Sequence, residues 1–375
     1  MIYVLLTLLV APLLFLRLAL RRGPAEPQRI LVIQTAKIGD FVSTTPLLRE
    51  IKRALPQAQL AVLLHPVNLP LARHNPHIDE LLPLRPEGLR GLRGRIWLMR
   101  ILSRRRIDTV VCASPSLAAW TAPFWAGVAR RMSVLPNYAG ATYRVARPLL
   151  THAEPHRAGR RVIETQAALL AQIGIRVQSL MTEAFAAPSA EQAAERIVPQ
   201  DSRPTVGIGV SAGNKLKELG EERLLELARG ILESSEVRLV LIGGPDDRRL
   251  VEQVIAHLPP ERVVDAVGAL GLDQLPALLA RLDAYVGVDS GITYLADACG
   301  VAVVDLMGPA DADDQRPGGP RAVVLRSDLP CAPCSHAFKA PYHCAIGTRA
   351  CIRGVALDTV ARAVVDLLKS GARRA

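Results

Sequence analysis

The chain has 375 residues, with 46 lysines and arginines against 35 aspartates and glutamates, which gives a formal net charge of +11. Half of the residues are apolar and 22% are charged, a balance that supports sizeable cores and excludes a disordered chain, a disulfide-stapled mini-protein and a polytopic membrane protein. This length is typical of two domains. Aromatic residues make up only 4%, which argues against stacking on single-stranded nucleic acid, so no nucleic-acid partner is expected.

The N-terminal segment predicts a membrane anchor. Residues 2–16 contain no charged side chain, and arginines follow at 17, 21, 22 and 29, the reverse of the order in a secretory signal. Residues 2–20 are just long enough to span a hydrocarbon core of about 30 Å, and the positive charge behind them favours a cytoplasmic position for the rest of the chain. Pro12 and Arg17 weaken a spanning helix, so a helix lying in the interface is the alternative. We assign residues 1–28 to the anchor and its basic flank.

Positive charge is concentrated in the first half of the chain. Residues 1–185 carry 25 basic and 10 acidic side chains, a net charge of +15, whereas residues 186–375 carry 21 and 25, a net charge of −4. Eight arginines lie between Arg85 and Arg106, where Glu87 is the only acid. This arginine cluster is either a solvated helix face or a surface that meets anionic lipid headgroups or a phosphorylated substrate.

The rest of the chain predicts an α/β fold. Continuous apolar runs rich in β-branched residues alternate with amphipathic stretches, a pattern typical of parallel strands buried on both faces. The series restarts at Thr205, which predicts Rossmann-like halves at 29–185 and 205–355, a linker at 186–204 and a terminal helix at 356–375. We expect the halves to face each other across a cleft at the carboxyl ends of their strands. The predicted strands are 30–35, 60–65, 108–113, 205–210, 237–243, 284–288 and 301–307.

The first candidate site follows the opening strand. Asp40 comes after Gly39, which would allow a tight turn, and precedes an amphipathic stretch at 42–55. Asp40 is either an N-cap of that helix or a general base that takes a proton from an attacking hydroxyl. The two roles conflict, because hydrogen bonds from helix N–H groups lower the basicity of a carboxylate. Lys37, Gly39 and Thr44 are the candidate acceptor-binding residues of this segment.

The second candidate site is the segment 211–217 after the first strand of the second half. Small residues such as Ser211 let the backbone approach a phosphate, and Lys215 or Lys217 can neutralise the charge on a leaving diphosphate. The spacing does not match a P-loop. A tight turn at Gly243 and Gly244 is a further place for the backbone to pass close to a nucleotide.

The third candidate site is the segment 287–293, where a buried strand meets a helix. Ser290, Gly291 and Thr293 would supply hydroxyl and N–H groups at the start of that helix, an arrangement that binds anions. Asp289 either holds sugar hydroxyls or caps the helix.

Together these motifs resemble the heptosyltransferases of lipopolysaccharide core biosynthesis, glycosyltransferase family 9. The resemblance covers residues 29–355 and is carried by segments at 30–40, 44–48, 75–79, 241–245, 289–293 and 308–309. It implies a GT-B fold with an N-terminal acceptor domain and a C-terminal nucleotide-sugar domain. It also implies metal-independent, inverting transfer from an ADP-activated heptose to a phosphorylated glycolipid at the cytoplasmic face of the inner membrane.

The resemblance also implies roles for three residues. Asp40 matches the catalytic base, Lys217 the lysine beside the donor phosphates, and Asp289 the acid that holds the donor sugar. Two departures leave the donor sugar open. The family often has an aromatic residue shortly after the lysine, where this chain has Glu218 and Leu219. It commonly has a histidine where this chain has Thr293 and Tyr294.

Four of the six cysteines lie close together in the sequence, with His336 and His343 nearby. Their thiolates could hold a structural Zn²⁺ or, less favourably, an iron–sulfur cluster. They could equally stay reduced as free thiols, or take part in disulfide or redox chemistry. Cys112 and Cys299 are expected to be buried as small hydrophobic side chains. The clustered cysteines are Cys331, Cys334, Cys344 and Cys351.

Three functions are therefore to be distinguished. A membrane-associated glycosyltransferase requires an acceptor for turnover. A sugar-nucleotide epimerase on the same two-half architecture would convert the donor alone. A non-catalytic binding protein would hold a nucleotide sugar or a glycolipid and turn over neither.

Overall fold

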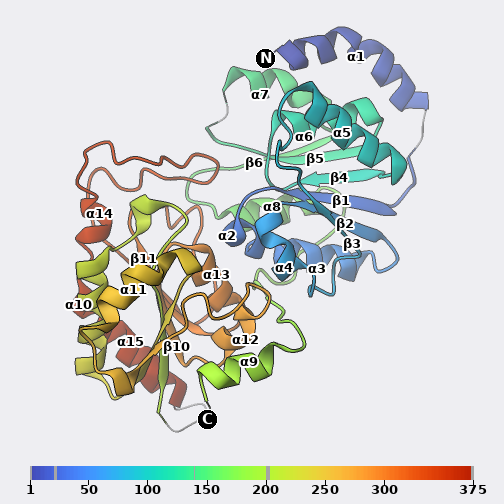
Figure 1. Ribbon diagram of the computed structural model, residues 1–375. Helices are drawn as coiled ribbons and strands as arrows, with labels where there is room; N and C mark the ends of the chain where they lie inside the picture. The colour runs from blue at the N-terminus through green and yellow to red at the C-terminus, as the bar shows by residue number, and fades with distance from the viewer. Residues whose placement is uncertain (1, 21–22, 139, 200–202, 373–375) are drawn as a thin grey trace. The chain divides into compact units, whose positions relative to one another are not determined.

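A computed structural model describes residues 2–20, 23–138, 140–199 and 203–372 (Figure 1). It divides the chain into two compact units, Met1–Leu180 and Met181–Ala375. The boundary lies just ahead of the predicted linker, and that linker is not plain coil: residues 190–197 form a helix that packs within the second unit. Each unit is an α/β layer structure, as expected. That their sheets face each other across a cleft stays a prediction.

Unit 1 contains one parallel six-stranded sheet in the order β3-β2-β1-β4-β5-β6. The central strands are continuous apolar runs that are buried on both faces, which is why the sequence predicts them well. The strands are β1 (Arg29–Gln34), β2 (Gln59–Leu64), β3 (Glu80–Pro83), β4 (Thr109–Cys112), β5 (Arg130–Leu135) and β6 (His152–Pro155). The helices are α1 (Ile2–Leu20), α2 (Ile38–Val42), α3 (Thr45–Ala54), α4 (Leu69–Ala72), α5 (Gly91–Arg104), α6 (Leu117–Ala126), α7 (Ala141–Ala146) and α8 (Val162–Ala171), with 3-10 turns η1 (Pro66–Asn68) and η2 (Arg147–Leu149).

Unit 2 repeats this topology. Its parallel sheet has the order β12-β11-β10-β7-β8-β9, so in each unit the first strand lies beside the fourth. This is the doubly wound order in which the chain reverses direction at the sheet centre. The strands are β7 (Thr205–Gly209), β8 (Arg238–Ile242), β9 (Val263–Asp265), β10 (Ala284–Val288), β11 (Ala302–Met307) and β12 (Ala322–Arg326). The helices are α9 (Ala190–Ile197), α10 (Glu221–Ser234), α11 (Arg248–Ile255), α12 (Leu275–Ala280), α13 (Gly291–Ala298), α14 (Ala350–Arg353) and α15 (Leu357–Ala372), with 3-10 turns η3 (Lys215–Lys217), η4 (Pro245–Asp247) and η5 (Pro260–Arg262).

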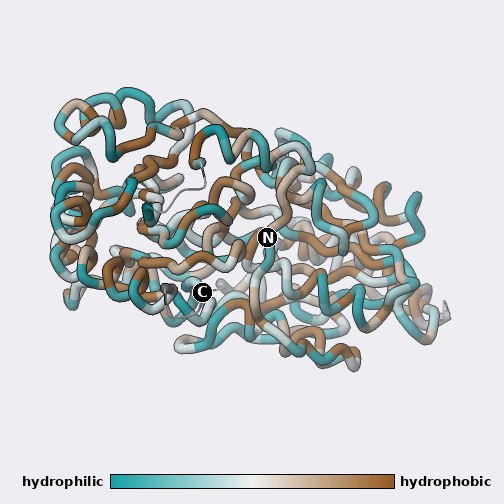
Figure 2. Tube along the Cα trace, turned by 90° about the horizontal axis from the view of Figure 1, so that it is seen from below, coloured by the Kyte–Doolittle hydropathy of each residue, from teal (hydrophilic) through white to brown (hydrophobic). Residues whose placement is uncertain are grey.

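Each unit has its own hydrophobic core between sheet and helices. Hydrophobic runs alternate with hydrophilic ones along the trace, as this layering requires (Figure 2). The terminal helix α15 packs against α10 and therefore completes the second unit.

The N-terminal segment forms the expected helix, α1, which lies against α6 and α7 of unit 1 (Figure 1). Within the described part of the chain, no helix has both the length and the apolar character needed to cross a membrane, so the spanning form of the predicted anchor is not confirmed.

Candidate active site

In unit 1, the centre of the sheet is where β1 and β4 lie side by side. Sheets of this order bind ligands outside the carboxyl ends of these two strands, because the following loops diverge there. The side chains directly after the strands meet at this point, with Thr35 Oγ1 lying 3.3 Å from Ser114 Oγ. The loop that carries Asp40 therefore starts at the expected ligand-binding edge of the sheet.

Asp40 is the third residue of the short helix α2 and is half-buried. The helix predicted at 42–55 is α3, whose N-cap is Thr44, and the N-cap of α2 is Lys37, so the alternative that Asp40 is an N-cap is wrong. The carboxylate lies in the first turn, where the partial positive charge of the helix start stabilises its ionised form. Gly39 lies inside the same helix with an ordinary negative φ, so the turn does not depend on the conformational freedom of glycine. Lys37 is exposed at the start of α2.

A buried polar network fixes the position of α2. Gln34 Nε2 donates to Thr44 Oγ1 at 2.7 Å, and Thr44 Oγ1 donates to the backbone carbonyl of Asp40 at 2.7 Å. The Ala36 N–H donates back to Gln34 Oε1 at 3.2 Å, which closes the loop after β1. Thr44 is fully buried. These contacts assign Thr44 to holding the Asp40 segment in place, instead of the direct contact with an acceptor that the sequence suggests.

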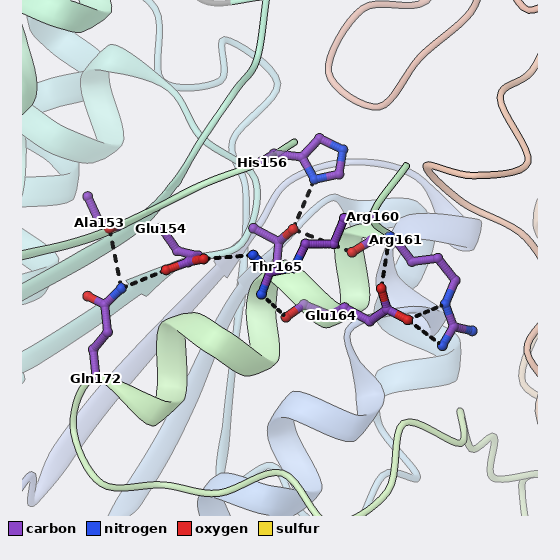
Figure 3. A network of polar contacts seen from close by, with 8 residues as sticks. All are labelled: Ala153, Glu154, His156, Arg160, Arg161, Glu164, Thr165 and Gln172. Carbon is purple, nitrogen blue, oxygen red and sulfur yellow. Dashed lines mark hydrogen bonds and ion pairs between the residues drawn. The ribbon is translucent and has the colours of Figure 1, made fainter. Parts of the chain in front are cut away.

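A second network lies after β6, where α8 begins (Figure 3). The ring nitrogen His156 Nδ1 lies 2.9 Å from Thr165 Oγ1, and both side chains are buried. Two arginines of this turn are paired within the unit: Arg160 with Glu154 at 2.7 Å, and Arg161 with Glu164 at 2.8 Å. These arginines are therefore largely neutralised locally and stabilise the turn.

In unit 2, the corresponding sheet centre holds an ion pair between two predicted site residues. The Lys217 ammonium, from the segment after β7, contacts Asp289 Oδ2 directly after β10. The other carboxylate oxygen, Asp289 Oδ1, accepts a hydrogen bond from the Tyr294 hydroxyl at 2.9 Å. Asp289 is thus held from two sides, and the N-cap position of α13 belongs to Ser290. The alternative that Asp289 caps the helix is wrong.

Beneath this pair lies a carboxyl group that the sequence motifs did not single out. Asp305, on β11, is opposite Gly287 in the strand register and fully buried, and neither of its oxygens has a hydrogen-bond partner among the described residues. Burial raises the pKa of Asp305 well above its usual value, and the nearby Asp289 carboxylate raises it further, while Lys217 opposes the shift. Asp305 therefore retains its proton at pH values where an ordinary aspartate is ionised. The sequence could have indicated this group, because Asp305 is an aspartate inside the otherwise apolar run 301–307.

The turn after β8 packs against the segment after β7. Ser211 Oγ donates to Asp247 Oδ2 at 2.7 Å, and the Gly244 N–H donates to the same oxygen at 2.8 Å. A Cβ on Gly243 would come within 2.6 Å of Val210 Cγ2, so this position requires glycine for space. Ser211, Gly243 and Gly244 therefore hold the turns after β7 and β8 together, and the Ser211 hydroxyl is engaged within the unit.

Lys215 and Thr293, also predicted to bind the nucleotide-sugar donor, have partners other than Asp289, the partner of Lys217. Lys215 is 80% exposed and pairs with Glu218 at 2.7 Å, and this hydrogen bond raises the pKa of the Lys215 ammonium. Glu218 also accepts a hydrogen bond from the Ala212 N–H at 3.2 Å. This residue, which departs from the family pattern after the lysine, therefore closes the loop after β7. Thr293 is fully buried, and its hydroxyl donates to the Val288 carbonyl at 2.6 Å.

The start of α13 remains the anion-binding element of unit 2. Gly291 and the next residues form its first turn, where backbone N–H groups have no partner inside a helix. The Ser290 hydroxyl lies 3.2 Å from Thr293 Oγ1 and does not cap the helix backbone. The first-turn N–H groups and the Lys217 ammonium are thus positive groups that this end of the sheet offers to an anion.

The four clustered cysteines line one small pocket with Leu216 and Pro309. Hydrogen bonds from the following backbone N–H groups lower the pKa of Cys344, whereas burial raises the pKa of Cys334 and Cys351. Among the described residues, the group whose potential ligand atoms all lie within 4.8 Å of one another is a different one: Asp311, Asp314 and His336. In that group His336 Nδ1 lies 3.0 Å from Asp311 Oδ2, as in an ordinary hydrogen bond. The predicted zinc site is not supported, although the thiols share one pocket. Cys112 is buried as expected, and Cys299 is half-buried.

Comparison with known proteins agrees with this topology. The family model of glycosyltransferase family 9 (heptosyltransferase) matches residues 98–343. Lipopolysaccharide heptosyltransferase 2 of Escherichia coli K12 is 26% identical over 313 residues, which is 80% of this chain and 88% of the relative. Among solved structures, a glycosyltransferase family 9 protein of Veillonella parvula has a TM-score of 0.75 at 20% identity and covers 93% of this chain and 100% of its own.

A second solved structure, the ADP-heptose lps heptosyltransferase II of E. coli, has a TM-score of 0.71 at 23% identity and covers 92% of this chain and 99% of its own. The likeness to both structures confirms the expected GT-B-like fold. Because the family model covers more than half of the residues, the chain belongs to glycosyltransferase family 9, the heptosyltransferase family.

Proposed function

We propose that this protein transfers a heptose from an ADP-activated donor to a phosphorylated glycolipid of the lipopolysaccharide core, with inversion at the anomeric carbon and without a metal ion. The membership of the heptosyltransferase family and the names of the relatives, which are lipopolysaccharide heptosyltransferases, support the reaction class. The observation that carries the proposal is the Lys217–Asp289 pair, braced by Tyr294, at the centre of the second sheet.

Unit 2 has the groups that a nucleotide-sugar donor needs. A diphosphate competes with Asp289 for the Lys217 ammonium, and the N–H groups at the start of α13 bind its oxygens. Once Lys217 turns to the phosphates, the Asp289 carboxylate is free to accept hydrogen bonds from sugar hydroxyls, while Tyr294 keeps it oriented. Donor binding and sugar recognition are therefore coupled through one ion pair.

Unit 1 supplies the base. The Asp40 carboxylate takes the proton of the acceptor hydroxyl as the hydroxyl oxygen forms a bond to the anomeric carbon. The bond from that carbon to the diphosphate oxygen breaks, and ADP leaves with the electron pair, its charge stabilised by Lys217 and α13. We assign Lys37, exposed at the start of the same helix, to an acceptor phosphate, and Gly39 to the acceptor-binding segment beside it. We place this reaction at the cytoplasmic face of the inner membrane, where such an acceptor is embedded.

The test is release of ADP by purified protein supplied with ADP-heptose and a truncated core acceptor. Asp40→Asn is expected to lower kcat by a factor of about 10² to 10⁴, the usual contribution of a general base. Glu26→Gln is the matched control, because Glu26 is an exposed carboxylate ahead of the amino end of β1. A chelator is expected to leave the rate unchanged.

Two outcomes would favour the competing functions. Conversion of the donor with no acceptor present indicates an epimerase. Binding of donor or glycolipid without turnover, unchanged by Asp40→Asn, indicates a non-catalytic binding protein.

A further inference from the structure

One face of α1 is part of the core of unit 1. Val4, Thr7 and Ala11, spaced three and four residues apart, are buried against the unit. The indole Trp125 Nε1, on α6, donates to Thr7 Oγ1 at 2.9 Å, and the Thr7 hydroxyl donates to the Tyr3 carbonyl at 2.6 Å. A buried polar contact of this kind fixes which face of the helix points inward, because an unpaired indole N–H would be costly.

The opposite face of α1 is apolar as well, and it is exposed. Leu9 and Leu13 expose 78% and 72% of their surface. Leucines this exposed on consecutive helical turns are unusual on the surface of a water-soluble domain. The exposed leucines recur at helical spacing and form one stripe, the α1 stripe. It consists of Leu5, Leu6, Leu9, Leu13 and Leu16, whereas Phe15 packs edge-on against Phe124 of the unit, with ring centroids 4.9 Å apart.

Segments of unit 1 near α1 carry exposed basic side chains. Arg144 on α7, which contacts α1, and Arg147 on η2, directly after α7, are exposed. On α5, Arg93 and Arg100 are exposed, and the neighbouring Arg95 places its guanidinium 4.5 Å from the ring of Tyr3 on α1. One member of the arginine cluster thus contacts α1, and the half of the chain that contains both carries a net charge of +15.

We infer that α1 lies in the plane of an anionic lipid surface, with the α1 stripe inserted among the acyl chains and the nearby arginines on the headgroup phosphates. A helix packed on one side against its own domain and apolar on the other matches an interfacial helix. Each nearby arginine strengthens attraction to an anionic leaflet, and the attraction falls with added salt. A helix that spans the bilayer would instead have to leave the contacts of Thr7 and Trp125.

The charge distinguishes a lipid surface from a second copy of the chain. Two copies joined through the α1 stripe would bring two sets of exposed arginines together, which costs free energy by like-charge repulsion. An anionic membrane supplies the opposite charge over the same area.

The experiment is flotation of the full chain with vesicles of phosphatidylcholine alone, or of phosphatidylcholine with 30% phosphatidylglycerol. The double variant Leu9→Gln/Leu13→Gln is expected to lower the affinity for anionic vesicles at least about tenfold, since two leucines no longer insert. Val67→Gln, on η1, is the matched control, because Val67 is an exposed apolar side chain of the same unit outside the stripe. Raising the salt from about 0.1 to 0.5 M is expected to weaken binding of the wild type.

The thermal unfolding of the double variant is expected to match the wild type, because neither leucine packs in the core. Unchanged vesicle binding by the double variant would overturn the inference. So would resistance of the protein in native membranes to alkaline carbonate extraction, which indicates a spanning helix, or a dimer in light scattering that the double variant abolishes while vesicle binding persists. Each readout is independent of turnover, so the inference and the proposed reaction can fail separately.

Discussion

Two buried tyrosines of unit 2 provide a sharp test of how the site is held together. The hydroxyl of Tyr294 donates to Asp289 Oδ1 at 2.9 Å, whereas the hydroxyl of Tyr285, also buried, makes no hydrogen bond of ordinary geometry among the described residues, with the Thr293 and Ser290 hydroxyls beside it. Replacing either residue by phenylalanine removes one oxygen and keeps the ring. The two variants therefore compare a hydrogen bond to an ionised carboxylate with a buried hydroxyl that makes none of ordinary geometry.

The expected difference follows from the partner lost. A hydrogen bond to a charged group contributes about 1.5–3 kcal/mol, and Tyr294→Phe also leaves a carboxylate oxygen short of a donor in a nearly dry position. We expect a loss of about 2 kcal/mol in the free energy of unfolding. For a unit of this size, that corresponds to a fall in Tm of about 4–8 °C. Tyr285→Phe removes a buried hydroxyl without such a hydrogen bond and is expected to change stability by less than about 0.5 kcal/mol or to raise it.

Differential scanning calorimetry gives the Tm of both variants, and turnover at increasing ADP-heptose concentration gives KM and kcat for each. Because Tyr294 orients Asp289, Tyr294→Phe is expected to raise KM for the donor more than it lowers kcat. Equal destabilisation by the two substitutions, or an unaltered Tm for Tyr294→Phe, would refute the idea that Tyr294 braces the Lys217–Asp289 pair.

Four further substitutions test the same unit. Burial raises the folded-state pKa of Asp305, so the stability linked to its proton is present at low pH and lost as pH rises toward that pKa. Asp305→Asn is therefore expected to gain stability relative to the wild type as pH rises from about 5 to 8, by at most about 1.4 kcal/mol per pH unit. Urea unfolding at these two pH values would contradict this if the variant and the wild type differed by the same free energy of unfolding at both. Gly243→Ala places a methyl group within 2.6 Å of Val210 Cγ2 and is expected to cost about 1–3 kcal/mol in urea unfolding; a midpoint equal to the wild type speaks against the close approach. Lys217→Ala is expected to weaken ADP binding about tenfold or more in calorimetry, and Lys215→Ala, at an 80% exposed position, far less; equal losses would show that the ion pair to Asp289 does not mark the phosphate lysine.

The sheets were predictable where strands are buried on both faces. Each of the seven predicted strands exists, because a short, continuous run of β-branched residues buries both of its faces in a parallel sheet covered by helices. The missed strands depart from that pattern. In β5, Arg131 lies buried in the middle of a sheet, where its guanidinium donates to the Leu149 carbonyl at 2.7 Å, a contact that only the fold creates. On the edge strand β12 the side chains are half-buried, so its apolar run is short and weak as a signal.

The site was predictable as a set of loops, but not as a set of contacts. The end of each central strand was identifiable, which located Asp40, Lys217 and Asp289. Which lysine reaches Asp289 depends on the 3-10 turn η3, and η3 has no distinctive pattern in the sequence. Tyr294 stood out in the sequence only as a departure from a family histidine, yet its hydroxyl holds Asp289.

The hydrogen bond between α1 and α6 has a practical consequence for any laboratory that handles this protein. Trimming the first 28 residues is an obvious way to obtain a better-behaved fragment, since the leucines of α1 invite aggregation. The cut would also remove Val4 and Ala11 from the core and deprive Trp125 of its hydrogen-bond acceptor, leaving an uncovered apolar surface on α6. Mild detergent or lipid nanodiscs, with the chain left whole, are the better route to a stable sample.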